Sequence, residues 1–207
     1  MHKFDLIHFI KVSITVYVFY MFLYGTWYFL HIQDFASLRL ENSWTGSLVF
    51  LPHGARVLMV CFFRYYSLPA LYLADITGPS FMNHDQYDVN YVEGSNIAAI
   101  GCIAAVILSV ELIKWSRVSE GNFSFFSPVN FKNYKFLFLV VVLSSLLSGV
   151  LCNSIISIIN DQVSIDVLTV LRFMIGDFLG AVAVIAIMWI IFTTAIDNRM
   201  IISPEKH

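Results

Sequence analysis

The sequence predicts an all-α integral membrane protein: a bundle of about six transmembrane helices that forms a single domain over residues 1–207. Of the 207 residues, 58% are hydrophobic and only 13% are charged. The mean hydropathy of +0.76 exceeds that of soluble globular domains. Apolar runs of ~20 residues, the length that crosses a bilayer as a helix, recur along the chain. The lipid bilayer is therefore its expected surrounding.

Five apolar segments have the length of a membrane-spanning helix, and a sixth is shorter. The five are residues 9–31, 46–64, 95–114, 135–159 and 168–196, and the shorter one is 66–80, with Pro69 near its start. The first segment is rich in aromatic and β-branched residues, which favour strands. A lone segment in lipid must satisfy its own backbone hydrogen bonds, so a helix is expected there as well.

Lysine and arginine gather on one side of this six-helix arrangement. With both termini on the same side, that side collects Lys3, Lys11, Arg64, Lys114, Arg117, Lys132, Lys135, Arg199 and Lys206. The other side keeps Arg39 and is acidic, with Asp34, Glu41, Asp85, Asp88, Glu93, Asp161 and Asp166. Cytoplasmic connections are enriched in lysine and arginine, so the N- and C-termini are expected in the cytoplasm.

The connection 114–135 mixes cations with Trp115 and four phenylalanines. Two interpretations stay open for it: an amphipathic segment at the lipid headgroups or a docking surface for a partner. The cysteines Cys61, Cys102 and Cys152 lie in apolar segments without metal-knuckle spacing, so they are expected to be packing residues. Neither a metal site nor a nucleic-acid-binding surface is predicted, because no ligand cluster or basic patch is present in the sequence.

Four charged residues inside the apolar segments are considered as site candidates, because a charge in lipid is costly unless it is paired or hydrated. Glu111 lies three residues before Lys114, so a local pair accounts for it. Arg172 begins the last segment and can extend along its aliphatic stem toward the interface. These two are secondary site candidates.

Arg56 and Asp177 are the main candidates. Both are expected at comparable depth near the midplane, in segments that enter from the outer side, so the sequence predicts an ion pair between them. Either the pair is purely structural or it forms the floor of a ligand-binding cavity. Pro52 and Gly54 predict a kink around His53, which would then contact a ligand or respond to protons.

Gly176 and Gly180 lie on either side of Asp177 in the sequence. Their small-xxx-small spacing allows helices to approach closely. Such an approach would also let a neighbouring helix bring a polar group to Asp177.

The stretches "FLPHGARVL", "SLPALYLAD" and "RFMIGDFLG" resemble the motifs of the membrane-associated sensor domain of the first type (the MASE family). That family comprises integral-membrane sensory modules of bacterial signalling proteins. The chain is similar to a shortened, standalone form, with His53 where the family more often has a small residue. The resemblance implies a multi-pass protein of the bacterial inner (cytoplasmic) membrane that takes part in signal transduction.

The predicted function is therefore a sensory or ligand-binding membrane module. It is expected to lack an output domain of its own and to act through a protein partner or a larger membrane complex. Two alternatives stay open: an accessory structural subunit of such a complex, and the substrate-binding component of a small-molecule importer. An enzyme is not expected and no catalytic residue is proposed, because hydrolase motifs such as Gly-x-Ser-x-Gly or His-Glu-x-x-His are missing from the sequence. No cofactor is identified.

Overall fold

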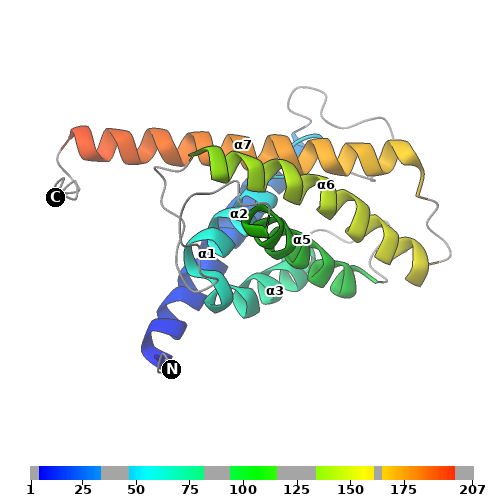
Figure 1. The fold of residues 1–207 in the computed structure, drawn as a ribbon, viewed down its shortest axis with the longest axis horizontal. Coiled ribbons are helices and arrows are strands. Elements are labelled where there is room, and N and C mark those ends of the chain that lie inside the picture. The colour runs from blue at the N-terminus through cyan, green and yellow to red at the C-terminus, as the bar shows by residue number, and fades with distance from the viewer. Residues whose placement is uncertain (1–4, 34–46, 82–93, 116–133, 161–164, 199–207) are drawn as a thin grey trace.

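Six α-helices make up most of the computed structural model, which describes residues 5–33, 47–81, 94–115, 134–160 and 165–198 (Figure 1). They are α1 (Leu6–Ile32), α2 (Leu51–Phe63), α3 (Leu68–Thr77), α5 (Ser95–Trp115), α6 (Tyr134–Ile159) and α7 (Val167–Asp197). Two short 3₁₀ turns, η2 (Arg64–Tyr66) and η3 (Gly78–Phe81), follow α2 and α3. These described ranges contain no strand, in agreement with the predicted all-α class.

Four of these helices, α1, α5, α6 and α7, are long and apolar enough to cross a membrane. The other two are not, because α2 has 13 residues and α3 has 10, well below the ~20 that a full crossing needs. The sequence therefore predicted the positions of the six helices correctly, but only four of the described helices fit the expected six membrane spans. The lengths expected for the second and third helices, residues 46–64 and 66–80, were wrong.

Pro52 lies in the first turn of α2 rather than in its interior. The proline lacks only an N–H that has no acceptor at a helix start, and its fixed φ suits that position. The helix then continues without interruption through Gly54 to Phe63, so the predicted kink around His53 is wrong. Pro69 begins α3 in the same way.

The two short helices form the arms of a V, with its apex at η2 (Figure 1). The chain changes direction at Arg64, which has a φ of +52° and a ψ of −134°. A positive φ is unusual for a side chain larger than glycine and is tolerated here within a buried turn. Both arms contact α1, while α2 also packs against α7 and α3 packs against α5.

The bundle buries polar side chains within its apolar core and exposes many large apolar side chains. Fully buried hydroxyl and amide side chains include Ser67, Ser109, Ser144, Ser145 and Asn153, whereas Phe22 is 69% exposed and Trp189 is 65% exposed. A soluble protein would arrange these groups in the opposite way. Such a surface suits a lipid environment, where helices associate through small and polar residues at their interfaces.

Short caps begin two of the long helices. Asp5 accepts hydrogen bonds from the backbone N–H groups of Ile7 and His8 at the start of α1. Asp166, just before α7, accepts one from the N–H of Thr169 at 2.7 Å. Hydrogen bonds from the side chain and backbone of Thr169 hold the pKa of the Asp166 carboxyl below its ordinary value. The connections 34–46, 82–93 and 116–133, including the acidic loops and the aromatic–basic segment, lie outside the described residues.

Candidate functional site

A cavity of about 140 Å³ lies inside one end of the bundle. Its walls come from all six helices and the segments next to them: Tyr20, Tyr24, Trp27, Ser47, Phe50, Arg56, Asp75, Pro79, Ser95, Ala98, Ala99, Cys102, Ser148, Cys152, Ile156, Phe173 and Asp177. The C-terminal halves of α1, α3 and α6 meet there with the N-terminal halves of α2, α5 and α7. In the topology predicted from the charge distribution, this is the outer end.

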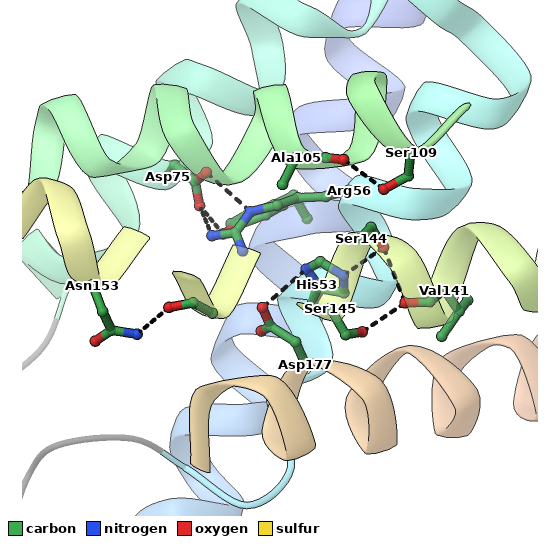
Figure 2. A network of polar contacts seen from close by, with 12 residues as sticks. His53, Arg56, Asp75, Ala105, Ser109, Val141, Ser144, Ser145, Asn153 and Asp177 are labelled. Atoms are coloured by element: carbon green, nitrogen blue, oxygen red, sulfur yellow. Dashed lines mark hydrogen bonds and ion pairs between the residues drawn. The ribbon is translucent and has the colours of Figure 1, made fainter. Parts of the chain in front are cut away.

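Arg56 and Asp75 form a two-point ion pair across the V of α2 and α3 (Figure 2). The Arg56 Nη2 lies 2.6 Å from Asp75 Oδ1, and the Arg56 Nε lies 3.1 Å from Asp75 Oδ2. Both side chains are at least 93% buried. A paired guanidinium and carboxylate satisfy each other in a fixed orientation, so this contact joins the two arms.

Aromatic rings surround the guanidinium. The Arg56 Nη2 also donates to the Tyr20 hydroxyl at 3.2 Å, and that hydroxyl donates to Asp75. The Arg56 Cζ lies 5.8 Å from the centre of the Tyr20 ring and 5.3 Å from that of Phe50. Cation–π attraction of this kind adds to the ion pair in a desolvated site. The charge of Arg56 is thus fully engaged within the protein.

His53 connects α2 to the carboxylate of α7. Its Nδ1 lies 3.4 Å from Asp177 Oδ2, a charge contact longer than a direct hydrogen bond, and its Nε2 lies 3.0 Å from Ser144 Oγ (Figure 2). His53 is completely buried and Asp177 is 3% exposed. The candidate site therefore holds two adjacent pairs, Arg56 with Asp75 and His53 with Asp177.

The predicted ion pair between Arg56 and Asp177 is wrong, because each of the two residues pairs with another one. The reason is partly the start of α2: the helix begins at Leu51, so Arg56 is its sixth residue, about 8 Å along the axis, and not the tenth as expected. Asp75 supplies the counter-charge instead. His53, Arg56 and Asp177 are nevertheless brought together at one end of the bundle, and Arg56 and Asp177 line the same cavity.

Asp75, Tyr20 and Ser144 were overlooked as site residues at the sequence level. Asp75 is the single charged residue of segment 66–80, and the cost of an intramembrane charge was a sufficient signal to find it. Tyr20 and Ser144 carry no comparable signal, because aromatic and small hydroxyl residues are common in membrane helices. Only the packing of α1 and α6 against α2 selects them.

The glycines of α2 and α7 create the close approach that this geometry needs. A methyl group at Gly54 would lie 2.7 Å from the Cβ of Val184. At Gly176 and Gly180 it would lie 1.9 Å and 2.1 Å from the backbone oxygens of Ser47 and Phe50. The chain before α2 therefore crosses directly over α7, and the Phe50 N–H donates to the Gly176 carbonyl at 2.9 Å. The small-xxx-small spacing thus accommodates the backbone before α2, and His53 of α2 lies 3.4 Å from Asp177.

The secondary candidates lie away from the cavity. Glu111 accepts from Lys114 Nζ at 2.7 Å, which confirms the predicted local pair. Arg172 is partly buried in the second turn of α7 and does not line the cavity. The three cysteines are buried and free, as expected of packing residues, and Cys102 and Cys152 also contribute to the cavity wall.

A cavity with aromatic walls, one paired arginine and two carboxylates suits the binding of a small polar molecule. Within the described ranges no group of three or more metal-ligating side chains is close enough together to hold a metal ion. Comparisons of the chain with protein-family models, with curated proteins and with solved structures found no match.

Proposed function

We propose that this chain is a membrane-embedded sensory module that binds a small ligand in the cavity and transmits the binding event to a protein partner. The observation that carries the proposal is the placement of Arg56, Asp75 and Asp177 around one cavity inside an otherwise apolar bundle. Charged groups inside a membrane protein are costly and are typical of ligand, ion or proton sites.

The size of the cavity supports a ligand of about one aromatic ring. Its volume of about 140 Å³ is close to that of an engineered protein cavity of about 150 Å³ that binds benzene. Five aromatic residues form much of the wall: Tyr20, Tyr24, Trp27, Phe50 and Phe173. They provide flat apolar surfaces, whereas the charged and hydroxyl groups provide orientation.

The shape of α7 supports a sensory role. Asp177 lies in its N-terminal half. The whole helix has 31 residues, about 46 Å, and its C-terminal part extends beyond the rest of the bundle (Figure 1). A rigid helix that contacts the ligand at one end and projects at the other can carry a displacement to a partner. The resemblance to bacterial sensory modules, with its bacterial inner-membrane location, belongs to the same proposal.

A ligand screen tests the binding step. Wild-type protein in lipid nanodiscs would be heated with small cationic, neutral and anionic compounds, and unfolding would be followed by fluorescence. A ligand at about 100 times its Kd is expected to stabilise the fold by about 2.7 kcal/mol. Ala99→Phe, which fills the cavity, should remove the stabilisation. Ile97→Phe, at a 53% exposed residue of the same helix outside the cavity wall, should retain it.

Ligand binding in this cavity would be contradicted if no compound stabilises the wild-type protein, or if the stabilising compounds also stabilise Ala99→Phe.

The second candidate function is the substrate-binding component of an importer. The position of the cavity at the end predicted to face outward favours this function. Purification from the native membrane separates the two: a kinase or cyclase partner supports sensing, and an ATPase in fixed stoichiometry supports import. Capture in a large assembly without ligand binding would support the accessory-subunit alternative.

A further inference from the structure

We infer that the cavity accepts a small organic cation at Asp177, and that its binding releases one proton that His53 and Asp177 share. This inference rests on the proposed ligand-binding function and specifies the ligand class. The charges are decisive. Arg56 and Asp75 neutralise each other through two contacts, so Asp177 is the remaining charged group on the cavity wall among the described residues.

The hydrogen bonds of Ser144 favour one tautomer of His53. The Ser144 hydroxyl has a single hydrogen, which it donates to the Val141 carbonyl at 3.2 Å. With its hydrogen on the Val141 carbonyl, the Ser144 oxygen accepts at the 3.0 Å contact with His53 (Figure 2), and in this arrangement the Nε2 of His53 carries a hydrogen. In a neutral imidazole the other nitrogen, Nδ1, then presents a lone pair to Asp177.

A lone pair and a carboxylate oxygen repel each other at 3.4 Å unless a proton is available to one of them. The pair therefore holds one proton in either of two forms: an imidazolium beside a carboxylate, or a neutral imidazole beside a carboxylic acid. Both forms have zero net charge. Because both groups are buried, neutrality of the pair avoids the large cost of an isolated charge.

The other titratable groups around His53 and Asp177 do not change the net charge of the site. Tyr20 on α1, Cys102 on α5 and Cys152 on α6 are neutral near pH 7 in their ordinary forms. Arg56 on α2 and Asp75 on α3 cancel each other. On α7 itself, the nearest charged residue in sequence is Arg172, outside the cavity wall. The site is neutral only while His53 and Asp177 keep their shared proton.

A monovalent cation entering this site would give it a net positive charge if the proton stayed. Release of the proton to solvent leaves a neutral imidazole, an anionic Asp177 and the bound cation, so charge and atoms balance. The aromatic walls favour the same ligand, because a cation is attracted to ring faces. An anion finds no uncompensated positive group among the described lining residues, since Arg56 is already paired.

Calorimetry with three matched probes tests the inference on the wild-type protein in nanodiscs, with empty nanodiscs as the blank. Benzylammonium, benzyl alcohol and benzoate share one ring and differ in charge. Benzylammonium is expected to bind most tightly. Titration in two buffers of different ionisation enthalpy should show one proton released per cation bound. The affinity should fall about tenfold per pH unit on acidification through the range where the pair is protonated.

Two substitutions of a carboxylate by an amide locate the effect. Asp177→Asn should abolish both benzylammonium binding and proton release. Glu111→Gln, which changes the exposed pair with Lys114, should leave both unchanged. If Asp177→Asn fails to fold, the proton count of the wild-type protein still decides the question.

Each other result of the calorimetry would overturn a defined part of this inference. Binding of benzylammonium without proton release overturns the exchange and leaves the ligand-binding function standing. Equal or tighter binding of benzyl alcohol or benzoate overturns the preference for cations. Failure of all three probes overturns the inference, and the wider ligand screen then decides separately whether the cavity binds anything.

Discussion

At the scale of single residues, the buried charges are organised as two neutral pairs rather than as one. Arg56 is satisfied by Asp75 and Tyr20, whereas His53 contacts both Asp177 and Ser144. Each arrangement avoids an isolated charge in a medium of low dielectric constant. The two pairs differ in how firmly they are held. Arg56 and Asp75 share several short contacts, whereas His53 and Asp177 share a single, longer one.

Removing Asp75 from the tightly held pair of Arg56 and Asp75 should show how much this pair contributes to stability. Asp75→Ala leaves the buried guanidinium of Arg56 without its counter-charge and is expected to lower the free energy of unfolding by about 3–5 kcal/mol. The apolar double variant Arg56→Met/Asp75→Leu should recover most of that loss. Denaturant unfolding in mixed micelles measures both.

Glu111→Ala is the control, because it breaks the exposed pair with Lys114, for which about 0–1 kcal/mol is expected. A loss for Asp75→Ala no larger than that of the control would show that the buried pair contributes little to stability.

At the scale of elements, α7 organises the site through its small residues. Gly176 and Gly180 leave room for the backbone of residues 47–50, which brings the start of α2, and with it His53, against Asp177. The two short helices follow from this crossing: α2 begins only after the chain has passed over α7, and proline occupies its first turn. A cavity remains where the V of α2 and α3 faces α5, α6 and α7.

Adding one methyl group to this crossing should separate the elements. In Gly180→Ala the new Cβ would lie 2.1 Å from the Phe50 carbonyl oxygen, and backbone must move to relieve the clash. An overpacking loss of about 1–3 kcal/mol is expected, together with loss of ligand binding. Thermal unfolding in nanodiscs measures the first effect and calorimetry the second.

Gly25→Ala provides a matched control, because no atom lies within 4 Å of the added methyl group in α1. Alanine favours a helix over glycine by up to about 1 kcal/mol, so this variant should be unchanged or more stable. Equal effects of the two substitutions would contradict the close crossing.

At the scale of the whole molecule, the cavity and two helix-end lysines, Lys114 and Lys135, lie at opposite ends of the bundle. The cavity lies at the C-terminal end of α1 and the N-terminal end of α7, whereas Lys114 and Lys135 lie where α5 ends and α6 begins. The positive-inside rule therefore predicts that the cavity faces away from the cytoplasm.

Thiol labelling tests this orientation. Gln33→Cys, at the exposed end of α1 nearest the cavity, should react with a membrane-impermeant maleimide in intact cells. Asn198→Cys, exposed at the end of α7, should react only after permeabilisation. The wild-type protein should give little background, because its three cysteines are buried. The opposite labelling pattern would reverse the proposed topology.

The amino-acid sequence was enough to predict the helical class, the positions of the helices, the local pair of Glu111 with Lys114 and three residues of the site. These follow from hydropathy over ~20 residues and from contacts within one or two helical turns. The start of α2 at Leu51, the pairing of Arg56 with Asp75 and the contact of His53 with Asp177 were decided only by the tertiary structure. The physical reason is that a buried charge requires a partner without specifying which one, and the choice depends on how closely the glycines of α7 let the chain before α2 approach.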